Sequence, residues 1–182
     1  MMPFFKSEPV TAAREFLDRA LSQMTFDPKN MTSTADHVLT SHVHDAAYRK
    51  YGQKVLPLSR SISAYEALSK GAGEGTPRVL ARRLGKSLGA NLIFTGAVWV
   101  FTEKMPGAAG MDRPSSVAFS VYLLEAEEGT VVWKAACRKV QRTSSEAMVD
   151  LRGLAKGKFK WLTAGELARE EIQKIFKPIP LR

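Results

Sequence analysis

The residue types that most often carry chemistry are few in this 182-residue chain, and their spacing does not suit catalysis. Its three histidines are His37, His42 and His44. On a helix His37 and His44 would share a face but His42 and His44 would not, and a zinc site favours a pair four residues apart. Asp45 follows His44 directly, and such neighbours point apart on a helix. We interpret the histidines as surface or partly buried side chains and predict no metal site.

Nucleophiles and phosphate-binding loops are equally sparse. The single cysteine, Cys137, lies in a strand-like segment and is expected to be a small buried hydrophobe. There is no Gly-x-Ser-x-Gly elbow, and the serine pairs 115–116 and 144–145 fit the starts of a strand and a helix. The glycine-rich stretch 71–75 lacks the Gly-Lys-Ser/Thr of a phosphate loop. We therefore predict no catalytic residue and no cofactor, and keep an enzyme of unknown class only as a third alternative.

The charge of the chain is strongly basic. It carries 27 Lys and Arg against 18 Asp and Glu, a net charge of +9, with a sequence pI near 9.8. The positive electrostatic field of such a chain favours anionic partners: nucleic acid, phospholipid head groups or envelope polymers. A surface that is basic only for solubility is the alternative. No stretch of the sequence approaches the roughly 20 apolar residues of a membrane span, and no basic-then-apolar signal opens the chain.

Two segments are the best candidates for contact with a partner. Residues 104–114 are rich in Gly, Ala, Met and Pro, and are too long for a tight turn. Residues 156–161 alternate lysines with aromatic side chains, which could stack bases and contact phosphates. The alternative, which we favour, is that the aromatic rings anchor a loop while the lysines reach water. The candidate partner-binding residues are Lys104, Met105, Met111, Arg113, Lys156, Lys158, Phe159, Lys160 and Trp161.

Helical periodicity and capping residues predict the helices. One helix should start at a Thr32 or Ser33 cap and end before Gly52. Thr76-Pro77 should open another, with Val79, Leu80, Leu84 and Leu88 facing the core and Gly89 closing it. A capping box of Thr163 and Glu166 should begin the last helix. The expected ranges are 11–24, 33–51, 61–70, 77–88 and 164–176.

The strands complete the predicted fold. Segments 91–103, 116–126 and 130–142 are rich in β-branched and aromatic residues, and Glu127-Glu128-Gly129 should form a hairpin turn between the last two. The range 53–58 is a short strand candidate, and Met1–Phe5 resembles the end of a strand that begins upstream. We predict one α/β (α+β) domain over 1–182. Its central mixed β-sheet of four to five strands should carry a C-terminal antiparallel meander and packed helices.

Three segments together resemble a known group of proteins: Met2–Phe5 followed by a helix, Leu84–Gly96, and the hairpin Val117–Trp133. The arrangement resembles the small α/β domains of bacterial envelope lipoproteins. That group includes the curli-secretion lipoprotein, the outer-membrane activators of penicillin-binding proteins and the TolB amino-terminal domain. The tail Trp161–Glu170 is most similar to that of uncharacterised deltaproteobacterial lipoproteins. The resemblance covers roughly Pro3 to Phe176.

The resemblance implies a non-catalytic, periplasmic adaptor that binds a protein partner, and the basic charge adds an anionic polymer or lipid head groups as candidate partners. It also implies an outer-membrane anchor through a lipid-modified cysteine. This sequence holds neither that cysteine nor the apolar strand that precedes Pro3-Phe4 in the group, so we expect both upstream of Met1. The alternative function is a basic cytoplasmic nucleic-acid-binding protein. Nucleic acid is the less expected partner, because the resembling domains carry a similar basic and aromatic segment without being nucleic-acid-binding proteins.

Overall fold

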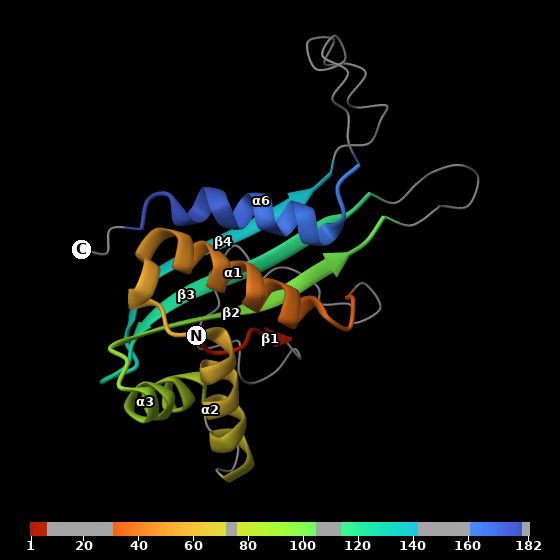
Figure 1. Ribbon diagram of the computed structural model, residues 1–182. Helices are drawn as coiled ribbons and strands as arrows, with labels where there is room; N and C mark the ends of the chain where they lie inside the picture. The colour runs from red at the N-terminus through yellow and green to blue at the C-terminus, as the bar shows by residue number, and fades with distance from the viewer. Residues whose placement is uncertain (7–30, 72–75, 105–113, 142–160, 180–182) are drawn as a thin grey trace.

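A computed structural model describes residues 1–6, 31–71, 76–104, 114–141 and 161–179. The expected helix over 11–24 lies outside these residues. Figure 1 shows the described elements. In chain order they are β1 (Phe5–Lys6), α1 (Ala35–Tyr51), the short 3-10 helix η2 (Gly52–Lys54), α2 (Leu58–Gly71), α3 (Pro77–Leu88), β2 (Leu92–Thr102), β3 (Ser116–Glu125), β4 (Val131–Val140) and α6 (Ala164–Phe176).

The four strands form one mixed sheet in the order β1-β2-β3-β4. β1 runs parallel to β2, and β2, β3 and β4 form an antiparallel meander. Helices α1 and α6 lie across one face of the sheet, and α2 and α3 lie near the end where β2 begins (Figure 1). The predicted α/β class, with a mixed sheet and a C-terminal meander, is confirmed. Gly129, at a φ of 74°, closes the β3–β4 hairpin as its sequence predicted.

The N-terminal residues belong to the sheet, as expected from Met1–Phe5. Phe5 pairs with Ala97, and the Met2 amide donates to the Phe94 carbonyl at 2.8 Å. The outer side of this strand is bound to α1. The Phe4 amide donates to the Thr40 hydroxyl at 3.0 Å, and that hydroxyl donates to the Asp36 carbonyl at 2.6 Å. A buried amide on the edge of the sheet is thus satisfied by a helix side chain.

The main core lies between the sheet and helices α1 and α6. β2 and β3 are buried along most of their length on both faces. In β2 this burial follows from apolar residues on both faces of the strand. The apolar side chains that α1 and α6 bury recur at the spacing of one helix face. The largest members of this cluster are Phe4, Leu39, Val43, Val98, Phe101, Val117, Phe119, Val121, Leu167, Ile172, Phe176 and Ile179.

A lysine of α1 joins the two helices that cover this face. The Lys50 ammonium donates to the carbonyls of Phe176, Lys177 and Ile179 at 2.6, 3.0 and 3.0 Å. The last carbonyls of a helix have no partner within it and carry a partial negative charge. Lys50 therefore caps the C-terminal end of α6 from the neighbouring helix.

Helix α3 packs a second, smaller core, with one departure from expectation. Ala81, Leu84 and Leu88 are buried against the sheet, but Val79 is 37% exposed and Leu80 is only partly buried. The prediction that Val79 faces the core is wrong. The buried face of the helix follows positions 77, 81, 84, 85 and 88, and Val79 lies on its flank.

The expected strand over 53–58 is also wrong. Gly52, at a φ of 57°, ends α1, and residues 52–54 form the 3-10 helix η2. Pro57 then precedes α2, whose first turn includes the bond from the Ser61 amide to the Pro57 carbonyl at 3.2 Å. A proline fits the first turn of a helix, so the short apolar run connects two helices. α2 accordingly begins before the expected residue 61.

The start of α1 differs in detail as well. We expected Thr32 or Ser33 as its cap, but Thr34 precedes the first helical residue and makes no side-chain cap. The Thr32 amide and hydroxyl instead donate to the Phe101 carbonyl at 3.0 and 3.2 Å. Thr32 therefore binds the segment before α1 to strand β2.

A close approach at Gly96 generates a first prediction. A Cβ at Gly96 would lie 2.3 Å from the Phe4 ring and 2.4 Å from the Ser120 carbonyl oxygen. Gly96→Ala should lower the free energy of unfolding by about 1–3 kcal/mol, because backbone and ring must both move. Urea denaturation followed by circular dichroism measures the change.

The matched control is Gly89→Asn. Gly89 has a left-handed φ of 64° and open space around its Cβ position, so asparagine should cost about 1 kcal/mol or less. Equal urea midpoints for wild type and Gly96→Ala would contradict the close approach.

Candidate functional site

The described ends of the two predicted contact segments meet beyond the end of β2. Lys104 begins the 104–114 segment and Trp161 ends the 156–161 segment. The Lys104 ammonium lies 4.0 Å from the centroid of the Trp161 ring. A cation at this distance from an indole is attracted by the negative face of the ring. We call the residues around this contact, Glu103–Lys104, Pro114–Ser115, Gln141 and Trp161–Ala164, the junction.

Hydrogen bonds tie the strand ends to the chain that enters α6. The Ser115 hydroxyl donates to the Leu162 carbonyl at 2.9 Å, and the Leu162 amide donates to the Gln141 side-chain oxygen at 3.2 Å. The Gln141 amide in turn donates to the Ser115 carbonyl at 2.9 Å. Ser115 and Gln141 are buried. The ends of β3 and β4 and the residues before α6 are therefore held as one unit.

The first turn of α6 completes the junction. The Glu166 amide donates to the Thr163 hydroxyl at 3.1 Å, and the Thr163 amide donates to the Glu166 carboxylate at 3.0 Å, so the predicted capping box is confirmed. The Glu103 carboxylate accepts from the Ala164 amide at 2.8 Å. A carboxylate at a helix start satisfies a free amide and lies at the positive end of the helix dipole.

Sequence reasoning found only part of this junction. It selected Lys104 and Trp161, which the structure brings together. The other seven candidates, Met105, Met111, Arg113, Lys156, Lys158, Phe159 and Lys160, lie outside the described residues. It missed Glu103, Ser115 and Gln141. Their partners lie between 21 and 61 residues away along the chain, so no local pattern reveals them.

The histidines do not converge. His37 is 80% exposed at its side chain, whereas the His44 Nε2 lies 3.1 Å from the Leu56 carbonyl oxygen. Burial lowers the pKa of His42, and the nearby Arg169 charge lowers it further. Within the described parts of the chain, no group of three or more His, Cys, Asp or Glu side chains could hold a metal ion.

Cys137 is buried, as predicted, and its thiol points to Glu171 with an Sγ to Oε2 distance of 3.9 Å. Burial and the neighbouring carboxylate raise its pKa to about 11. The thiol is therefore protonated at neutral pH, and a protonated thiol is a poor nucleophile. This environment fits a core side chain.

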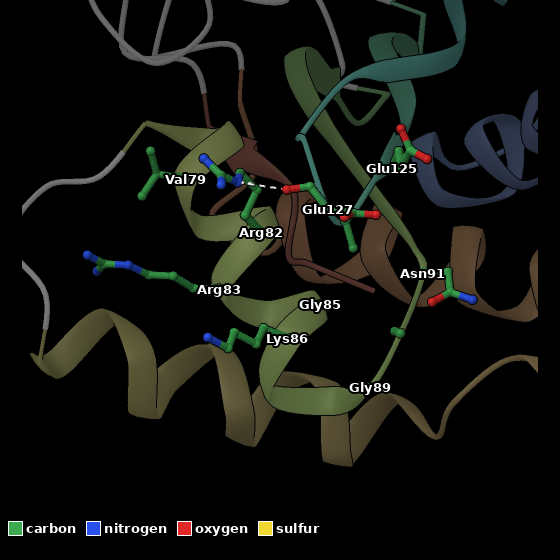
Figure 2. A pocket seen from close by; sticks show the side chains of 11 residues that line it. Val79, Arg82, Arg83, Gly85, Lys86, Gly89, Asn91, Glu125 and Glu127 are labelled. Carbon is green, nitrogen blue, oxygen red and sulfur yellow. Dashed lines mark hydrogen bonds between the residues drawn. The ribbon is translucent and has the colours of Figure 1, made fainter.

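A groove lies between α3 and the β3–β4 hairpin, at the end of β3 (Figure 2). None of its lining residues belongs to the junction. Its volume is about 960 Å³. The Arg82 Nε donates to the Glu127 carbonyl at 2.9 Å across it. A Cβ at Gly85 would lie 2.2 Å from that of Ala126, so glycine permits the close packing of helix on hairpin. The lining residues are Val79, Arg82, Arg83, Gly85, Lys86, Gly89, Ala90, Asn91, Glu125, Ala126 and Glu127.

Among the described helices, none combines the length and the apolar character that crossing a membrane requires.

No protein-family model and no curated protein matches the chain. Solved structures do match it loosely. The PelC dodecamer from Paraburkholderia phytofirmans aligns with a TM-score of 0.47 at 18% identity, over 83% of this chain and 79% of that one. Lipoprotein GNA1162 from Neisseria meningitidis has a TM-score of 0.44 at 10% identity, over 69% and 88%. The LpoB C-terminal domain from Salmonella enterica has 0.31 at 17%, over 47% and 56%.

The junction generates a second prediction, on Glu103. Glu103→Ala should lower the free energy of unfolding by about 1 kcal/mol, because the buried Ala164 amide loses its charged acceptor. Chemical denaturation measures the loss. The control is Glu66→Ala, at an exposed position of α2, which should change stability by less than about 0.5 kcal/mol. Equal effects of the two substitutions would argue against the cap.

Proposed function

We propose that this chain is a non-catalytic domain of the bacterial cell envelope that binds a partner protein or an anionic envelope component. The binding residues are those of the 104–114 and 156–161 segments. The observation that carries this proposal is the contact between Lys104 and Trp161. One end of each segment lies at this contact, although the two residues are 57 positions apart along the chain.

The described residues of the junction support such a role. Binding residues are often found on loops whose ends are fixed by a rigid scaffold. Here residues directly next to β2, β3 and β4 are joined by hydrogen bonds to the start of α6 and the residues before it. Two segments that start from one fixed site can contact one partner together. Their lysines and arginines would favour an acidic surface on it.

The location we propose is the periplasm, with an anchor at the outer membrane through a lipid-modified cysteine upstream of Met1. Support comes from the resemblance of Met2–Phe5, Leu84–Gly96 and Val117–Trp133 to envelope lipoprotein domains. The parallel pairing of β1 with β2 is consistent with an N-terminal strand in such a domain.

The loop is the first test of this proposal, and the third prediction. Thr102 pairs with Ser116, so a short Gly-Ser linker can join Lys104 to Pro114 in place of residues 105–113. We expect the variant to lose capture of its partner from cross-linked cell-envelope extracts. Its melting temperature should stay within about 4 °C of wild type, which corresponds to under about 1 kcal/mol.

The control variant carries the same kind of linker in place of residues 72–75, between α2 and α3, and should keep the captured partner. A large fall in melting temperature on replacing 105–113 would show that the segment is structural. Unchanged capture would show that the partner binds elsewhere.

The location has its own test, the fourth prediction. Mass spectrometry of the N-terminal peptide of native protein, taken from fractionated source cells, should find a lipid-modified cysteine upstream of Met1 in the membrane fraction. An unmodified terminus at Met1 or Met2 in the cytosolic fraction would contradict the envelope location. It would then favour the alternative of nucleic-acid binding, which steep salt dependence of DNA or RNA retention would reveal.

A further inference from the structure

We propose that the groove between α3 and the β3–β4 hairpin binds a sugar chain that carries acidic groups. This site is separate from the junction and does not depend on the role proposed for it. Its volume of about 960 Å³ is at the upper end of the usual range for ligand sites. The groove is open, so it suits part of an extended ligand better than an enclosed small molecule.

One rim of the groove carries positive charge. Arg83 and Lys86 are three residues apart on α3, so they occupy neighbouring positions on the helix surface. Both side chains are exposed, and both line the groove. Neither makes an ion pair with any residue that the structure describes. A guanidinium and an ammonium placed together form a suitable site for carboxylate or phosphate oxygens.

The other rim offers acceptors. Glu125 and Glu127 are exposed on the hairpin, and Asn91 is exposed just before β2. In Figure 2 Arg83 and Lys86 extend on one side of α3, whereas Glu125 and Asn91 lie on the other. The described carboxylates of this rim make no ion pair across the groove. They remain able to accept hydrogen bonds from uncharged donors such as hydroxyl groups.

Small residues lie between these two rims. Gly85 and Gly89 belong to α3 and its C-terminal cap, and Ala126 follows β3. Gly85 and Ala126 pack against each other, and the space beside Gly89 is open to a ligand. The Arg82 guanidinium is held by its bond to the Glu127 carbonyl, so it is fixed in position beside this surface. Because residues of both rims line the same groove, a ligand that fills it can contact both.

The cationic rim and the acceptor rim together indicate which class of ligand the groove can bind. The ligand needs anionic groups along one edge and neutral hydrogen-bond donors along the other, which describes a chain of acidic sugars. A nucleic acid strand fits less well, because its regular phosphate charges would also face Glu125 and Glu127. A lipid chain fits poorly, because Val79 is the one large apolar side chain among the described residues that line the groove.

Tetragalacturonate is a suitable probe, and its binding is the fifth prediction. Titration of the isotope-labelled chain should shift the backbone amides of residues 83–91 saturably, with a millimolar or lower Kd. Maltotetraose, which has hydroxyls but no carboxylates, should bind at least about tenfold more weakly. Citrate, which has carboxylates but no sugar, should also bind at least about tenfold more weakly.

The double variant Arg83→Gln/Lys86→Gln should raise the Kd for tetragalacturonate by about tenfold or more, because it removes both charged donors. The control, Lys70→Gln/Lys139→Gln, removes the same charge at exposed positions outside the groove and should change the Kd by less than about twofold. Circular dichroism checks that both variants are folded.

Several results would overturn the proposal. Equal losses in the two double variants would mean that only the overall charge attracts the ligand. Equal binding of citrate would reduce the groove to a site for small anions. Shifts confined to the junction would place the ligand at Lys104 and Trp161, and would leave the proposed envelope function standing. Shifts with a hexaglutamate peptide but none with the sugar would make the groove a protein-binding site.

Discussion

The packing of Phe4 against the backbone of β2 is the constraint on which the rest of the structure depends. The Phe4 ring lies where a side chain at Gly96 would be, so strand β1 can approach β2 only because that residue is glycine. The same Phe4 presents its amide to Thr40, which fixes α1 over the edge of the sheet. Lys50 then holds the end of α6 against α1 through three carbonyl oxygens. The close contact between ring and backbone therefore positions the strand to which α1 is bound, and α1 in turn holds the end of α6.

The antiparallel meander of β2, β3 and β4 connects the Phe4 contact to both ends of the sheet. β2 and β3 are long and buried on both faces, so they are rigid along their length. At the end of β2, Glu103 caps α6 and Lys104 meets Trp161. At the opposite end, the β3–β4 hairpin contacts α3 around Gly85. The junction and the groove are thus built on the same pair of strands and can act independently.

Much of the fold could be predicted from local patterns, because caps, turns and buried strand faces each depend on residues that are close together in the sequence. The capping box of Thr163, the turn at Gly129 and the buried faces of β2 and β3 all follow from local spacing. The errors arose where local patterns are ambiguous. The run 53–58 is apolar and short, and such a run fits a strand or a helix connection. The junction bonds were missed because they join residues far apart in the sequence.

The net charge of +9 can be interpreted only when the position and the partners of each cation are known. Lys50 and Arg82 are used inside the fold, because each donates to backbone carbonyls. Lys6 pairs with Asp36 at 3.0 Å, and Lys104 lies on the Trp161 ring. Basic residues that stabilise the fold add to the pI without recruiting any ligand, so overall charge is weak evidence for nucleic-acid binding.

Arg83 and Lys86 differ from these cations. They are exposed, make no ion pair with a described residue and line the same groove. A partner recognised by charge is therefore better sought through such local pairs than through the pI, because an interaction between exposed charges falls off within about 10 Å at ordinary salt.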